Sequence, residues 1–194
     1  LDLFFINGET LEQVLYNYRR ITGFPAMPPV WSFGAWMSRL TYESEDEMVE
    51  VALRLRDEAY PMDVLNIDPG WFPERWKCDW TFSTERFPDP QAFFKRLREQ
   101  GFRVSLWQWP YIQYDVALHR TARERGYVGA PDNGQRVTVL PGLPDADTLD
   151  LTNPEAVPWY KGLVRDVLAK GAMAIKADFG ERIDENALYA NIDA

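Results

Sequence analysis

Short apolar segments alternate with capped, amphipathic segments through most of the chain, and this alternation restricts the fold more than any other feature. Strand-like apolar runs are expected near positions 31, 62, 103 and 173, the first of them from Trp31 to Met37. A glycine separates a predicted helix from the next strand at Gly101 and at Gly171. Near-continuous apolar strands separated by helices predict an α/β protein whose parallel strands are covered by helices.

Capping residues mark where the predicted helices begin. Thr10 with Gln13, and Ser44 with Glu47, form capping boxes, and the second box starts a helix that is expected to run to Glu58. Further helices are expected from Asp89-Pro90 to Gln100, over Val116 to Arg125, and from Asn153-Pro154 to Lys170. The segment from Gly129 to Asp147 is rich in glycine, proline and aspartate and is expected to be irregular, with a small hairpin.

The start of the chain is organised differently. A capped helix fades near Gly23, and three prolines between positions 25 and 29 form a stiff linker after it. We therefore expect a boundary between residues 1–24, the end of one unit with a connecting helix, and residues 25–194. The apolar run at 1–6 has no basic segment before it and no cleavage signal after it, so it is interpreted as part of a longer chain and not as a signal peptide.

Composition excludes several classes of function. The formal net charge is −9 and no cluster of basic residues occurs, so binding to nucleic acid or to an anionic membrane is not expected. The chain has one cysteine, Cys78, and one histidine, His119, which leaves no disulfide framework and no Cys/His zinc site. His119 lies in a charged helical run and is expected at the surface. We expect no cofactor or metal, and the single thiol favours a reducing compartment, the cytoplasm.

Two α/β architectures fit four parallel strands, a doubly wound sheet and a (β/α) barrel. No glycine-rich phosphate loop follows any strand, which weakens the nucleotide-binding form of the doubly wound sheet. Long segments follow the second and third strands, as in barrels, which build their sites on such loops. Aromatic residues make up 14% of the chain, and their rings suit either a sugar-binding cleft or a large core.

Three predicted strands end in polar or aromatic residues. Asp68 ends the second, Trp107 lies near the end of the third, and Lys176 and Asp178 end the fourth. Residues two apart on a strand face the same side, so Lys176 would favour the ionised form of Asp178. An ionised carboxylate beneath a sugar is what a retaining glycosidase needs, whereas a lone aspartate at a strand end is more often a cap or an ion-pair partner.

The segment Lys176-Ala177-Asp178-Phe179-Gly180-Glu181-Arg182-Ile183 resembles the nucleophile motif of glycoside hydrolase family 31, and within it the α-xylosidase branch. Further motifs match in order: Trp31-Ser32-Phe33-Gly34, Arg86-Phe87-Pro88-Asp89-Pro90, Trp107 with Pro110-Tyr111, and Asp150-Leu151-Thr152-Asn153-Pro154. This resemblance implies a partial (β/α)8 TIM barrel, about its first four strands, preceded by the last strand of a β-sandwich domain at residues 1–6 and a linker helix.

The resemblance also implies roles for individual residues. The catalytic residues would be Asp178, as nucleophile, and Glu181, as the second carboxylate of the motif. The substrate-binding residues would be Asp68, Trp107, Lys176 and Trp71. The general acid/base would come from a later strand, beyond Ala194, so the chain by itself is expected to have little or no activity. Ala177 stands where the xylosidase branch usually has threonine, and Pro69-Gly70 replaces bulkier residues after Asp68.

The resulting hypothesis is a fragment of a retaining α-glycosidase that hydrolyses α-linked xylose or a similar neutral sugar in an oligosaccharide or glycoside. Alternatives are an α-glucosidase or an α-glucan lyase of the same family, and a non-catalytic carbohydrate-binding homologue. A homo-oligomer formed by the full-length protein is left open.

Overall fold

The computed structural model describes residues 3–129 and 145–180 of the 194-residue chain. The chain divides into two compact units, Leu1–Phe33 and Gly34–Ala194. The first unit contains helix α1 (Leu11–Thr22), which the hydroxyl of Thr10 caps by accepting a hydrogen bond from the amide of Gln13. No strand occurs between residues 3 and 10. A strand needs a neighbour to bond to, so the assignment of residues 1–6 to a preceding β-sandwich domain stays a prediction.

The strand expected from Trp31 to Met37 is wrong in its first part. A 3-10 helix, η1 (Val30–Phe33), occupies that stretch, and the strand β1 (Ala35–Arg39) begins only after it. The carbonyl of Pro29 accepts hydrogen bonds from both the amide and the hydroxyl of Ser32, at 2.9 and 2.7 Å. These bonds close a turn after the proline, whose fixed φ suits a turn, and the apolar side chains alone do not reveal it.

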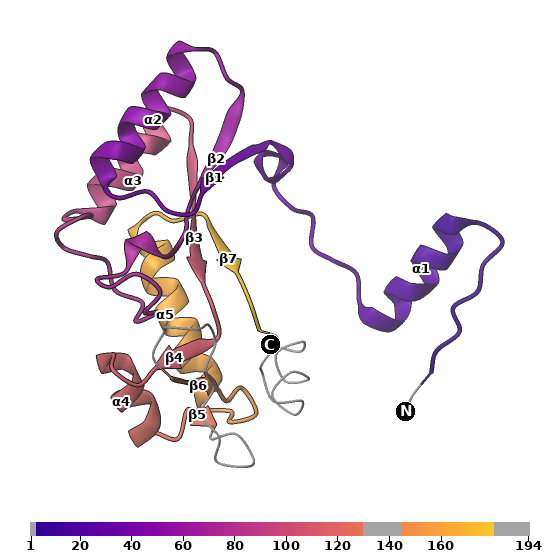
Figure 1. Cartoon of the computed structure of the whole chain (residues 1–194). Coiled ribbons are helices and arrows are strands. Elements are labelled where there is room, and N and C mark those ends of the chain that lie inside the picture. Colours follow the sequence, from indigo (N-terminus) through magenta and orange to yellow (C-terminus); the bar gives the residue numbers. More distant parts are fainter. Residues whose placement is uncertain (1–2, 130–144, 181–194) are drawn as a thin grey trace. The chain divides into compact units, whose positions relative to one another are not determined.

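The second unit is built on a parallel sheet of β1, β2 (Met62–Ile67), β3 (Arg103–Gln108) and β7 (Ala174–Ala177), in the order β1-β2-β3-β7 (Figure 1). Each new strand joins the same growing edge. In a doubly wound sheet the order in which strands are added reverses partway, and the ligand binds at that point. The order without reversal is that of a barrel, so the predicted partial barrel is confirmed over the doubly wound sheet that the strand pattern alone also fitted.

Helices α2 (Glu45–Asp57), α3 (Pro90–Glu99) and α5 (Ala156–Lys170) lie beside this sheet, with α3 in contact with both of the others (Figure 1). The predicted caps of α2 and α3 are confirmed: Ser44 accepts from the amide of Glu47, and Asp89 from that of Ala92. Helix α5 begins later than predicted. Asn153 accepts a hydrogen bond from the amide of Glu155, which caps a turn before the helix and not the helix itself.

The two faces of the sheet have different chemistry. Leu65 and Ile67 of β2, and Val104 and Leu106 of β3, belong to the hydrophobic core that also contains the buried residues of α2 and α3. The side chains between them alternate to the other face. That face carries Ser38, Asn66 and Ser105, which are register partners across three strands.

A small antiparallel sheet follows β3, in the order β4-β6-β5, formed by β4 (Tyr111–Gln113), β5 (Val128–Gly129) and β6 (Ala146–Leu149). The antiparallel pairing of β5 with β6 agrees with the predicted hairpin, and residues 130–144 between them lie outside the described residues. Helix α4 (Ala117–Glu124) packs on this sheet.

The surface position predicted for His119 is wrong. This residue is 5% exposed, and its Nε2 lies 2.8 Å from Oδ2 of Asp147 on β6. Tyr114 donates a hydrogen bond to the other oxygen of the same carboxylate, at 2.8 Å. The charged neighbours of His119 indicated an exposed helix, but its partner is distant in the sequence.

Among the described residues, no helix is long and apolar enough to span a membrane.

Gly171 should tolerate no side chain. Its φ is +126°, and a Cβ atom there would lie 2.8 Å from Cβ of Phe94 and 3.0 Å from the guanidinium of Arg98. We expect Gly171→Ala to lower the free energy of unfolding by about 1–3 kcal/mol, because strain and overlap add. Gly162 in α5 is the control, since a Cβ there meets no atom within 4 Å. Urea unfolding followed by tryptophan fluorescence should show Gly162→Ala to be neutral or stabilising, and equal effects of the two changes would contradict this account.

Candidate active site

The ends of β2, β3 and β7 bring the predicted site residues together. Trp107 and Lys176 are register partners on neighbouring strands. The amide of Asp178 donates to the carbonyl of Gln108 at 2.9 Å, which extends the pairing of β3 with β7 by one residue beyond the strand. Asp68 directly follows β2. Parallel strands end on the same edge of the sheet, so one cluster forms from residues that are more than 100 positions apart.

Lys176 lies between two carboxylates. Its Nζ is 3.1 Å from Oδ1 of Asp68 and 3.5 Å from Oδ2 of Asp178. Two carboxylates this close to one another repel, and a shared ammonium group offsets the repulsion. The prediction that Lys176 and Asp178 face the same side is therefore confirmed, and Asp68 joins them.

Asp178 is held by donors on both of its oxygens. The indole N–H of Trp107 donates to Oδ2 at 2.7 Å, and the amide of Phe179 donates to Oδ1 at 3.0 Å. Phe179 has φ +60°, a left-handed conformation that is uncommon for a bulky residue. This backbone conformation accompanies the hydrogen bond that fixes the Asp178 carboxylate, and the ring of Phe179 packs edge-on against Trp107 with centroids 6.4 Å apart.

The pKa of Asp178 is lowered from its ordinary value. Burial by itself raises the pKa, but the Trp107 indole, the Phe179 amide and the charge of Lys176 together lower it by more. The ionised form is therefore favoured at neutral pH. About 38% of the side chain is exposed, so the carboxylate is accessible to a ligand. This is the condition required of a nucleophile or of an anion that stabilises a cation.

The loop after β2 is fixed by Arg86, a residue of the Arg86-Phe87-Pro88 motif. Its guanidinium donates hydrogen bonds to the carbonyls of Gly70, Phe72 and Pro73. Gly70 lies against the loop after β1, where a Cβ atom would overlap Oγ1 of Thr41. The small residue at position 70 is therefore a requirement of the packing beside Asp68.

Trp71 does not line this cluster. It is 0% exposed, lies in the hydrophobic core, and donates its indole N–H to the carbonyl of Trp107 at 2.9 Å. The interpretation of Trp71 as a substrate-binding residue is not supported by this position, because Trp71 supports the backbone of Trp107 from behind. Trp107 is itself only 1% exposed and packs against Trp76 and Trp109. Much of the aromatic content therefore serves the core.

Asn66 is a member of the cluster that the sequence did not single out. Its Nδ2 donates to Oδ1 of Asp68 at 2.6 Å and to Oγ of Ser38 at 3.2 Å. The signal available was a polar residue two positions before Asp68, directly after the apolar pair Val64-Leu65. Glu181 lies outside the described residues. No group of three or more His, Cys, Asp or Glu side chains able to hold a metal ion occurs in the part of the chain that the structure describes.

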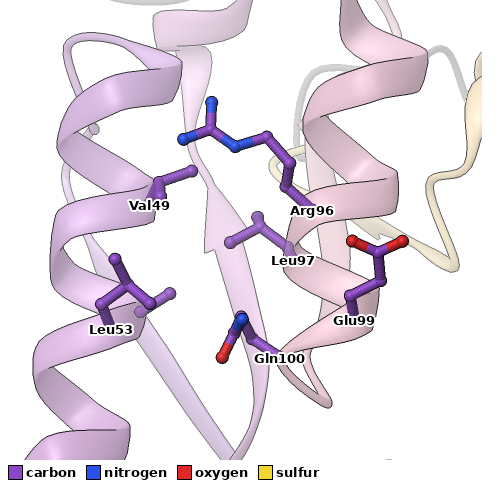
Figure 2. Close-up of a pocket in the computed structure, with 7 residues that line it drawn as sticks. Val49, Leu53, Arg96, Leu97, Glu99 and Gln100 are labelled. Atoms are coloured by element: carbon purple, nitrogen blue, oxygen red, sulfur yellow. The ribbon is translucent and has the colours of Figure 1, made fainter.

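A groove lies on the helical side of the second unit. This groove of about 190 Å³ separates α2 from α3 and is lined by Val49, Ala52, Leu53, Arg96, Leu97, Glu99 and Gln100 (Figure 2). Gln100 follows the end of α3 and precedes the start of β3. The groove therefore lies away from the strand ends that carry Asp68 and Asp178.

Comparison with known families agrees with the parallel sheet and helices of the second unit. The family described as the glycosyl hydrolases family 31 TIM-barrel domain matches residues 25–193. The chain belongs to glycosyl hydrolase family 31. The four parallel strands and their helices are part of the family 31 (β/α) barrel.

Three relatives illustrate the range of family 31 proteins that resemble this chain. Alpha-xylosidase XylQ of Lactiplantibacillus pentosus is 33% identical over 185 residues, which cover 94% of this chain and 24% of XylQ. Neutral alpha-glucosidase C of Mus musculus is 30% identical and is matched over 90% of this chain and 20% of its own length. A solved family 31 dextranase from Flavobacterium johnsoniae, complexed with glucose, is 26% identical with a TM-score of 0.82, over 93% of this chain and 23% of the dextranase. The chain thus spans about a quarter or less of the length of these relatives.

Removing the indole donor should change the pH dependence of the Asp178 carboxylate. In Trp107→Phe the hydrogen bond to Oδ2 is lost, so the pKa of Asp178 rises. If Asp178 acts in its ionised form, the acidic limb of kcat/KM in an active protein that contains this chain should move to higher pH. Trp109→Phe is the control, since no hydrogen bond from the Trp109 indole to Asp178 occurs among the described residues. An acidic limb that stays in place in Trp107→Phe would contradict the role of the indole.

Proposed function

We propose that this chain forms part of a retaining α-glycosidase in which Asp178 is the nucleophile. The observation that carries the proposal is the Asp178 carboxylate, whose pKa is lowered and whose oxygens are fixed by Trp107, Phe179 and Lys176. Membership of family 31 supports glycosidase chemistry in general.

The proposed reaction has two steps. In the first, an oxygen of Asp178 bonds to the anomeric carbon, and the bond between that carbon and the leaving oxygen breaks with protonation of the leaving group. In the second, water attacks the anomeric carbon and gives a proton to the acid/base group that protonated the leaving group, the bond to Asp178 breaks, and the sugar leaves with its configuration retained. Lys176 and Trp107 lower the pKa of Asp178, which keeps the nucleophile ionised. Glu181 is proposed as a second carboxylate of the site from its place in the motif.

For the substrate we propose an α-linked xyloside, with Asp68 and Lys176 binding the sugar, while the buried Trp107 acts on it through its hydrogen bond to Asp178. The similarity to XylQ favours xylose. An α-glucosidase is the second candidate, favoured by the similarity to neutral alpha-glucosidase C and to the dextranase. The two sugars differ in the C6 hydroxymethyl group, so comparing kcat/KM for aryl α-xylosides and α-glucosides separates them.

Two further alternatives concern the outcome at the same site. A lyase would form the same bond to Asp178 and then eliminate, so its product would be unsaturated. A binding-only homologue would bind sugar and give no product, and binding would survive Asp178→Asn. The cytoplasmic location and the homo-oligomer stay predictions.

Covalent trapping tests the nucleophile directly. Reaction of a complete family 31 protein containing this chain with a fluorinated xylosyl inactivator should add one sugar to the peptide that carries Asp178, because the second step is slowed. Mass spectrometry of the digested protein locates the label. Asp178→Asn should remain unlabelled, and a label on a peptide without Asp178 would overturn the assignment.

The 194-residue chain by itself should show no measurable turnover of aryl α-xylosides. A retaining enzyme needs a second carboxyl group about 5–5.5 Å from the nucleophile to act as acid and base. We propose that a later strand of the barrel supplies this group, and not Glu181. Asp68, which shares Lys176 with Asp178, accepts two hydrogen bonds on Oδ1 and suits binding better than proton donation. Turnover equal to that of a complete family 31 protein containing the chain would contradict this expectation.

A further inference from the structure

We propose that Asn66 is a positioning residue that sets the orientation of the Asp68 carboxylate for a sugar hydroxyl. The inference rests on the proposed function, because it assigns Asp68 to the sugar. Asn66 does not reach the reacting atoms; it acts through Asp68.

The amide group of Asn66 uses both of its N–H bonds. One is directed to Oδ1 of Asp68, at 2.6 Å, and the other to Oγ of Ser38 on β1, at 3.2 Å. These three residues come from β1, from β2 and from the position just after β2, and Ser38 and Asn66 are register partners. The hydrogen bonds therefore tie the Asp68 carboxylate to two neighbouring strands beneath it.

The burial of Asn66 argues against a purely structural role. The residue is 3% exposed, and its Oδ1 is buried without a hydrogen-bond partner among the described residues. Leaving a buried carbonyl oxygen unpaired costs stability, so packing alone would favour an apolar side chain at this position. The function of the amide must therefore lie with its nitrogen, and the charged acceptor of that nitrogen is Asp68.

The two oxygens of Asp68 are used differently. Oδ1 accepts from Asn66 at 2.6 Å and from Nζ of Lys176 at 3.1 Å. No residue in the described ranges donates to Oδ2. Two donors on one oxygen fix the rotation of the carboxylate and leave Oδ2 as the acceptor for a ligand hydroxyl. Without Asn66, Lys176 alone would hold Asp68, and Lys176 also contacts Asp178 at 3.5 Å.

The test compares Asn66→Leu with Ser105→Ala. Leucine has the branched shape of asparagine, with the same number of side-chain heavy atoms, and removes the donor. Ser105 is the matched control: it is the register partner of Asn66 on β3, it is 0% exposed, and its hydroxyl has no hydrogen-bond partner in the described residues. In a complete family 31 protein containing this chain, Asn66→Leu should lower kcat/KM for an aryl α-xyloside by about tenfold, mainly through KM, since one hydrogen bond to a charged group is lost. Ser105→Ala should leave kcat/KM within about twofold.

A double-mutant cycle separates positioning from general damage to the fold. If Asn66 acts through Asp68, adding Asn66→Leu to Asp68→Ala should cause no further loss of kcat/KM. Thermal unfolding of each variant reports stability independently. Unchanged KM in Asn66→Leu, or a full additional loss in the Asp68→Ala background, would overturn the proposal.

A binding measurement keeps this test separate from the test of hydrolysis. In the Asp178→Ala protein, the Kd for methyl α-xyloside should rise about tenfold on adding Asn66→Leu and should not change on adding Ser105→Ala. If the complete protein with Asp178 intact did not hydrolyse the glycoside, the proposed function would be defeated. A tenfold rise in Kd on adding Asn66→Leu would still support the role of Asn66. Equal Kd values with and without Asn66→Leu would defeat the role of Asn66, whatever the activity.

Discussion

The ammonium group of Lys176 lies within 3.5 Å of two carboxylates that are 110 residues apart in the chain, Asp68 and Asp178. Like charges repel, and the ammonium group between these two carboxylates offsets that repulsion. Lys176 therefore brings both side chains to one place, where the proposed function uses Asp68 for the sugar hydroxyls and Asp178 for the anomeric carbon. The organisation of the strand ends depends on this shared contact.

The parallel sheet makes this contact possible. Because β2, β3 and β7 run in the same direction and end on the same edge, their last residues lie together although they are far apart in the sequence. The aromatic core then fixes the side chains at the ends of these strands. Trp71 donates a hydrogen bond to the carbonyl of Trp107, and the Trp107 indole donates one to Asp178. The packed core thereby fixes the orientation of the Asp178 carboxylate.

Many features that depend on neighbours in the sequence were predictable, although the turn from Pro29 to Ser32 and the start of α5 were not. The caps at Thr10, Ser44 and Asp89 were identified because a capping side chain bonds an amide two or three residues away. Pairs two apart on a strand, such as Lys176 and Asp178, follow from the alternation of side chains. Features that depend on distant partners were missed. His119 was expected at the surface because its sequence neighbours are charged, and its partner Asp147 is 28 residues away.

The sequence by itself determined the alternation of strands and helices, the strand-end residues and the family they resemble. The pattern of strands and helices alone fits a doubly wound sheet as well as a barrel. The family resemblance predicted the barrel, and the order β1-β2-β3-β7 agrees with it. The tertiary structure alone also separated the aromatic residues by role, with Trp107 bonded to Asp178 and Trp71 behind it. The tertiary structure also added Asn66 to the site, because its burial and its hydrogen bonds to Ser38 and Asp68 form only when the strands pack together.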